Sequence, residues 1–166
     1  MRNLLVFFFM FVSSAIIAEE PATAKDIELC LPDEQVIFLC KAKHKTVAIC
    51  ASKNLSNTTG FAQYRVFDLG KDIIDFVFPE QRIPPGRNFI METHPLPGGM
   101  DIKIKFSNNG LSYVIHERDA PVAGEGFEGL NEVIVRHNEI ILDSIKCIND
   151  DSGVRRAGYD SFFTQD

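Results

Sequence analysis

Residues 36–67, VIFLCKAKHKTVAICASKNLSNTTGFAQYRVF, decide the fold of this chain. Gln35–Lys41 and Thr46–Ala51 are rich in β-branched and other apolar residues, and the short basic turn between them completes the pattern of a β-hairpin. Ser52–Gly60 is polar and rich in Asn and Thr, which predicts a loop. Phe61–Phe67 then returns to a strand-like composition, so we expect a third strand beside the hairpin.

The rest of the chain consists of more short strands joined by turns. Met100, Ile102, Ile104 and Phe106 alternate with polar residues and should form one buried face of a strand. Asn108-Asn109-Gly110 predicts a tight hairpin turn after it, because Asn and Gly accept a positive φ at low cost. The other strands are expected at 73–78, 88–93, 111–116, 133–136 and 139–145.

Two segments interrupt this pattern. His94–Gly99 contains two prolines and two glycines, and we expect no regular structure there. Arg118–Gly129 is rich in glycine and charge and predicts a long loop. Because the strands are short, the connections are short and no amphipathic helix is evident, we expect an all-β fold. It should be a mostly antiparallel meander that closes as a small barrel or a two-sheet sandwich.

The N-terminus predicts export. Arg2, the apolar run Leu4–Val12 and the small residues up to Ala18 form the three parts of a signal peptide, and Ala24 offers a second cleavage point. A membrane anchor is the alternative, but a span needs about 20 apolar residues and this run is shorter. We expect a periplasmic or secreted protein made of a signal peptide (1–18), a lead-in segment (19–34), one β domain (35–148) and a polar tail (149–166).

The charge balance narrows the class of partner. The chain has 17 Lys and Arg against 23 Asp and Glu, and removing residues 1–18 takes away one Arg, which leaves a net charge of −7. This balance argues against nucleic acid and anionic membranes, and we expect no membrane insertion after signal cleavage. It suits a basic secreted protein such as a lysozyme, or an envelope component.

Four cysteines, Cys30, Cys40, Cys50 and Cys147, follow the signal peptide, so we expect two disulfide bonds. If the hairpin folds about Lys45, Cys40 and Cys50 lie opposite each other. We therefore expect Cys40 to pair with Cys50, which leaves Cys30 for Cys147. No spacing typical of a zinc site occurs, and we expect neither a metal nor another cofactor.

No sequence motif indicates catalysis. His116 and Glu117 are neighbours on a predicted strand and therefore face opposite sides of the sheet. The chain has no G-x-S-x-G or H-E-x-x-H motif, and oxidised cysteines offer no thiol nucleophile. We expect a non-enzymatic domain; a hydrolase that uses Asp72, Asp75 or Glu80 is the less favoured alternative.

The residues that lead from the loop into the third strand are the candidate binding site. Thr58-Thr59-Gly60, with Tyr64 behind them, could present hydroxyl groups and an aromatic ring to the cleft of a partner. In the purely structural interpretation, Gly60 makes a turn, the aromatic residues enter the core, and Gln63 and Arg65 lie on the exposed face.

Several short motifs follow one another along the chain. The chain has C-x(9)-C-A-S from Cys40, then the polar loop, then G-F-A-Q-Y-R from Gly60 and a strand that ends at Pro79. NNGLSYVIH (108–116) and VIVRHNEII (133–141) follow. In this order, over Cys30 to about Cys147, they resemble a widespread group of small exported bacterial proteins with no assigned activity.

The loop is also similar to the S-G-x-x-Y loop of the periplasmic lysozyme inhibitors of Gram-negative bacteria, which are small secreted β domains with a disulfide. In that family the loop enters the lysozyme cleft and its hydroxyls meet the catalytic carboxylates. Here Thr59-Gly60 and Tyr64 match, with Thr for Ser and one more residue before Tyr, and the chain has no Trp for the family's second motif. The resemblance implies a lysozyme-binding role for Thr58, Thr59, Gly60 and Tyr64. The alternative is an envelope-associated structural or interaction domain with another ligand.

Overall fold

The structure, a computed structural model, describes residues 29–86, 88–122, 126–148 and 153–154. The expected signal peptide with its two cleavage points, most of the lead-in segment and most of the polar tail lie outside these residues. The described residues form ten β-strands, and every strand pairing is antiparallel. Within the described ranges, no helix has the length and apolar character needed to cross a membrane.

The first sheet, sheet A, contains the predicted hairpin and the third strand. Its spatial order is β10-β1-β2-β3-β4, so four consecutive strands form a meander and the short β10 adds to β1. The strands are β1 (Glu34–Lys41), β2 (Lys45–Ser52), β3 (Ala62–Asp68), β4 (Ile73–Phe78) and β10 (Gly153–Val154).

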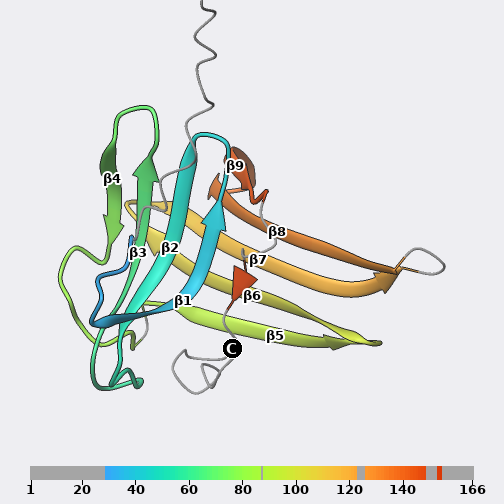
Figure 1. The fold of residues 1–166 in the computed structure, drawn as a ribbon, viewed down its shortest axis with the longest axis horizontal. Coiled ribbons are helices and arrows are strands. Elements are labelled where there is room, and N and C mark those ends of the chain that lie inside the picture. The colour runs from blue at the N-terminus through green and yellow to red at the C-terminus, as the bar shows by residue number, and fades with distance from the viewer. Residues whose placement is uncertain (1–28, 87, 123–125, 149–152, 155–166) are drawn as a thin grey trace, which may run out of the picture.

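The second sheet, sheet B, is a meander in the order β5-β6-β7-β8-β9. In the view of Figure 1 its strands run across the direction of sheet A, and β5 to β8 extend well beyond it. The strands are β5 (Ile90–Leu96), β6 (Gly99–Asn108), β7 (Leu111–Val122), β8 (Gly126–His137) and β9 (Ile140–Lys146). The all-β, antiparallel prediction is therefore confirmed.

One hydrophobic core joins the two sheets. It contains Ile37, Phe38, Val47 and Ile49 from sheet A and a matching set from sheet B. The predicted alternating strand supplies part of that set, because Ile102, Ile104 and Phe106 are buried and Met100 packs partly against them. The predicted Asn109-Gly110 turn also forms, and both residues have a positive φ.

Two predicted interruptions of the strands are wrong. His94, Pro95 and Leu96 belong to β5, where proline is tolerated because β5 is at the edge of sheet B. The expected loop Arg118–Gly129 is mostly strand, since β7 continues to Val122 and pairs with β8 from Gly126 onward. Backbone pairing in this long hairpin outweighs the local composition.

The disulfide pairing predicted from the sequence is also wrong. Cys30 is bonded to Cys50, and Cys40 is bonded to Cys147. Cys40 lies opposite Val47 in the hairpin, so the turn is centred slightly earlier than the sequence symmetry suggested. Cys40 also faces the core between the sheets, whereas Cys50 belongs to a small cluster on the outer face of sheet A. Two disulfides indicate a non-reducing compartment outside the cytoplasm.

Candidate binding loop

The loop from Ser52 to Phe61 connects β2 to β3 and is closed at its base. The Ser52 amide donates to the Phe61 carbonyl at 3.0 Å, and the Phe61 amide donates to Ser52 Oγ at 3.0 Å. Leu55, in the middle of the loop, is buried and packs into the core between the sheets. The loop therefore has a hydrophobic anchor as well as a hydrogen-bonded neck.

Hydrogen bonds also fix the tip of the loop. The Ser56 amide donates to the Thr59 carbonyl at 3.0 Å, and the Thr59 amide donates to Ser56 Oγ at 3.0 Å. The Thr59 hydroxyl donates to the Asn54 carbonyl at 3.1 Å, so the Ser56 hydroxyl, 2.6 Å away, is left to donate to Thr59 Oγ1. The Thr59 hydroxyl is thus engaged within the loop, whereas the side chains of Asn57 and Thr58 are exposed.

Gly60 performs the turning role expected of it. Its φ is +71°, a backbone conformation that residues other than glycine adopt only at a cost in free energy. A Cβ atom at this position would lie 2.2 Å from Ser52 Oγ and 3.0 Å from Leu55 Cα. Both the backbone angle and the close approach therefore require glycine, and the return of the chain into β3 depends on it.

Tyr64 does not join the predicted binding residues at the surface. Its side chain is 1% exposed and lies in the core, with its ring centroid 4.9 Å from that of Phe106 and 6.0 Å from that of Tyr113. Burial raises the pKa of the Tyr64 hydroxyl far above its ordinary value. Tyr64 is therefore a core residue in this structure, because this position of β3 points between the two sheets.

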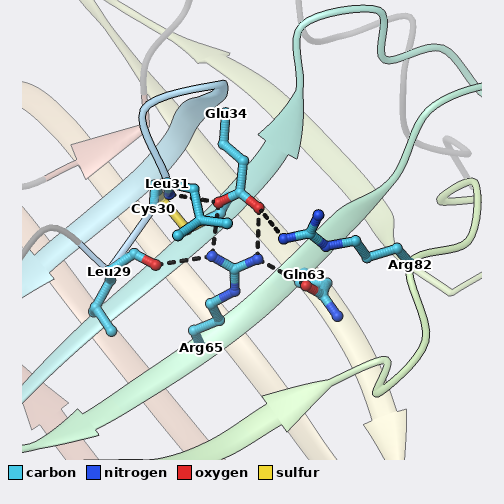
Figure 2. The surroundings of a disulfide bond; sticks show 8 residues. Leu29, Cys30, Leu31, Glu34, Gln63, Arg65 and Arg82 are labelled. Atoms are coloured by element: carbon cyan, nitrogen blue, oxygen red, sulfur yellow. Dashed lines mark hydrogen bonds and ion pairs between the residues drawn. A yellow bond between two sulfur atoms is a disulfide. The ribbon is translucent and has the colours of Figure 1, made fainter.

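A buried ion network lies on the other face of sheet A, beside the Cys30–Cys50 disulfide (Figure 2). Glu34 on β1 and Arg65 on β3 form a two-pronged pair with N···O distances of 2.7 and 2.8 Å. Arg82 adds a third contact to Glu34 at 3.0 Å. The carboxylate of Glu34 is only 1% exposed. Burial acts to raise the pKa of Glu34, but the hydrogen bonds from Arg65 and the Leu31 amide, with both arginine charges, outweigh it and hold that pKa below its ordinary value.

This network corrects a second expectation from the sequence. Gln63 and Arg65 were expected on an exposed face, and both are buried. The backbone before β1 and after β4 covers them: Arg65 donates to the Leu29 carbonyl at 2.8 Å, and Gln63 donates to the Pro79 carbonyl at 2.9 Å. Contacts between residues so far apart in the chain leave no spacing pattern in a sequence.

The network reaches the neck of the loop. The guanidinium of Arg82 lies 4.6 Å above the ring centroid of Phe61, a cation–π contact. Gln35, next to Glu34, donates from its side chain to the Ser52 carbonyl at 2.8 Å. Both ends of the loop are therefore attached to a buried frame, which holds the exposed tip in one geometry.

The cysteines and Glu34 are close enough together to suggest a metal site, but their bonding does not. The sulfur atoms of Cys30 and Cys50 and a Glu34 oxygen lie within 4.8 Å of one another. Both sulfurs are committed to the disulfide, and two arginines already neutralise the carboxylate. The arrangement stabilises the fold and holds residues 29–33 on sheet A.

The residues considered for catalysis are dispersed. His116 lies on the outer face of sheet B, with Nε2 3.2 Å from Asp101 Oδ1, while Glu117 is buried on the opposite face, as strand geometry predicts. Asp72, Asp75 and Glu80 are all exposed, and Asp75 pairs with Lys71 at 3.0 Å. These three carboxylates are solvated surface groups.

A hollow of about 670 Å³ lies along β4 and the turn between β6 and β7. Phe76 and Phe78 are half-buried in its wall and stack on Tyr113 and Phe106, with centroids 5.4 and 4.6 Å apart. The polar part of the lining has two carboxylates and three amide side chains: Asp75, Glu80, Gln81, Asn108 and Asn109. Apolar residues complete it: Ile74, Val77, Pro79 and Ile83.

Comparisons of the chain with protein-family models, with curated proteins and with solved structures find no match.

Proposed function

We propose that this chain is an exported, non-enzymatic binding domain, built as a two-sheet sandwich, and that the tip of the Ser52–Phe61 loop contacts a protein partner. The observation that supports this proposal is the pre-organisation of the loop. Its neck is hydrogen-bonded, Leu55 anchors it in the core, and Ser56 and Thr59 brace its tip. A loop that is already ordered loses little conformational entropy on binding, so more of its contact energy appears as affinity.

The chemistry of the tip fits a cleft that contains carboxylates. Asn57 and Thr58 present an amide and a hydroxyl donor, and Lys53 adds an exposed positive charge. Hydrogen bonds to ionised acceptors are about twice as strong as those between neutral groups. The net charge of −7 for the exported chain would speed its encounter with a basic protein. A secreted lysozyme, which is basic and has catalytic carboxylates in a cleft, is therefore the partner we propose.

The test is inhibition of lysozyme in a turbidity assay on bacterial cell walls. The exported chain in excess should slow clearing by at least one of the chicken-type, goose-type and invertebrate-type enzymes. Asn57→Ala combined with Thr58→Ala should weaken inhibition roughly tenfold or more, because neither side chain takes part in the internal bonds of the loop. Glu80→Ala combined with Gln81→Ala, an exposed polar pair on a different loop, is the matched control and should inhibit normally.

Full activity of all three enzymes with excess chain would refute the lysozyme proposal. Capture from periplasm or host fluid then tests the broader binding role. A partner that binds the native chain but not the Asn57/Thr58 variant would support the loop as the contact. Equal capture of the partner by the native chain and by the Asn57/Thr58 variant would exclude the loop as the contact.

The alternative function is an envelope-associated interaction domain, and the hollow beside β4 favours it. Half-buried aromatic faces surrounded by amides and carboxylates suit a polar ligand with an apolar face, such as a glycan. The Glu80/Gln81 variant separates the two functions. It should lose binding to isolated cell-wall glycan if the hollow is the site, whereas the Asn57/Thr58 variant should keep it.

A further inference from the structure

A cationic hollow lies at the end of sheet A opposite the loop. The turn between β1 and β2 has the sequence Lys41-Ala-Lys-His-Lys45 and packs against β9. The hollow between them has a volume of about 230 Å³. Three lysines and one aspartate in its wall give a net charge of +2, although the whole chain is acidic. The charged and polar residues of its lining are Lys43, His44, Lys45, Asp143, Ser144 and Lys146.

Covalent and hydrogen bonds hold the two walls of this hollow together. The Cys40–Cys147 disulfide joins them at the base, and the Ile148 amide donates to the Lys41 carbonyl at 2.9 Å. Lys45 bridges the walls through an ion pair with Asp143 at 2.9 Å. Figure 1 shows β9 beside the turn of the β1–β2 hairpin. The fold itself therefore holds the two walls of the hollow together.

Two of the lysines remain available for a ligand. Lys43 and Lys146 are exposed, and neither side chain makes an ion pair or hydrogen bond with another described residue. Because they come from opposite walls, an anion in the hollow could interact with both. A phosphate group carries the negative charge that two such lysines would bind through charge-assisted hydrogen bonds.

Exposed aliphatic side chains flank the cationic hollow. Ile141 and Leu142 directly precede its β9 wall and are 55% and 57% exposed, and Ile148 follows that wall and is 68% exposed. Exposed aliphatic and cationic side chains therefore occur close together in the chain, along β9 and directly after it. Surfaces that carry both kinds of side chain bind at the interface of anionic membranes, where the apolar groups enter the headgroup region and the lysines meet the phosphates.

We propose that the hollow and its aliphatic flank bind the surface of a membrane that contains anionic phospholipid, with a lipid phosphate between Lys43 and Lys146. The acidic composition of the chain argued against such a partner. Beyond a Debye length of about 8 Å, however, exposed charges are screened at physiological salt, so the local charge of the hollow decides the contact. The flanking aliphatic residues favour a lipid over a free phosphate ion, which has no apolar part.

The test is co-sedimentation of the chain, recovered after export, with vesicles of phosphatidylglycerol and phosphatidylcholine. Binding should require phosphatidylglycerol and weaken at 0.5 M salt. Lys43→Ala combined with Lys146→Ala should reduce the partition coefficient roughly 30-fold, since each lysine near an anionic surface contributes about a fivefold factor. Lys71→Ala combined with Lys103→Ala removes the same charge elsewhere and should leave binding within about twofold.

The aliphatic contribution is measured separately. Ile141→Ser combined with Leu142→Ser should lower the partition coefficient while leaving its salt dependence unchanged, because the lysines remain. Equal binding to pure phosphatidylcholine, or equal losses in the two double-lysine variants, would overturn the proposal. Lysine-dependent binding of inorganic phosphate without vesicle binding would likewise overturn it, since the site would then take a free anion.

Discussion

Replacing Glu34 by Gln should cost about 3–5 kcal/mol of folding stability, although the two side chains have nearly the same size. The Glu34 carboxylate accepts four hydrogen bonds: one from the Leu31 amide at 2.8 Å, two from Arg65 and one from Arg82. Each Glu34 oxygen accepts two of these bonds. In Glu34→Gln an NH₂ group replaces one of the two oxygens, so two hydrogen bonds are lost and two N–H donors then face the NH₂ group. The substitution also leaves the Arg65 guanidinium, 7% exposed, without its close counter-charge.

Urea unfolding at pH 7 measures this loss, and Asp75→Asn is the control. Asp75 pairs with Lys71 at 3.0 Å, a distance similar to those in the Glu34 network, but both partners are well exposed. Exposed pairs contribute little because water screens them, so the control should show no resolvable change in midpoint. Equal midpoints for Glu34→Gln and Asp75→Asn would refute the view that burial gives this pair its importance.

The pH dependence gives a second check. Because the pKa of Glu34 in the folded chain lies below its ordinary value of 4.5, its contribution is fully present above about pH 4.5. The contribution disappears as the pH falls through the lower, folded-state value. The gap in stability between the native chain and Glu34→Gln should therefore narrow in acid. A gap that stays constant from pH 7 to pH 3 would contradict the ionised state assigned to Glu34.

The remaining predictions concern packing and backbone geometry. Ile104→Ala should cost about 2–5 kcal/mol in thermal or chemical unfolding, whereas Lys103→Ala, on the other face of β6, should cost under about 0.5 kcal/mol; equal losses would show that the alternation has been misread. Gly60→Ala should cost clearly more than Gly110→Ala. Both positions have a positive φ, but only Gly60 approaches another atom closely, Ser52 Oγ. A reversed order in urea midpoints would count against the close approach.

The sequence predicted the parts of the fold that depend on local pattern. The alternation through Ile102 and Ile104 was enough to place β6, because one strand face must be buried and the other solvated. The Asn109-Gly110 turn was equally local, since it depends on the φ preference of two residues. Gly60 was predicted to turn the chain for the same reason.

The parts that depend on long-range contact were not predictable. The cysteine pairing depended on which face of sheet A each cysteine occupies, and Cys40 and Cys50 occupy opposite faces. Arg65 looked like a solvent-exposed residue because its cover comes from Leu29, far away in the chain. Tyr64 fitted both a core position and a binding motif, and only its contacts with sheet B distinguish them.

The Cys40–Cys147 disulfide bond affects what happens to the chain after proteolytic cleavage. Sheet A is built mainly from the first part of the chain and sheet B from the second, and the main chain passes from β4 to β5 through an exposed connection that contains Arg82. If trypsin cuts after Arg82, the two fragments stay covalently joined, since Cys40 lies in one and Cys147 in the other. The nicked chain should migrate as a single species on a denaturing gel and separate into two only after reduction. Such a molecule can be cleaved once between its sheets and still remain one molecule.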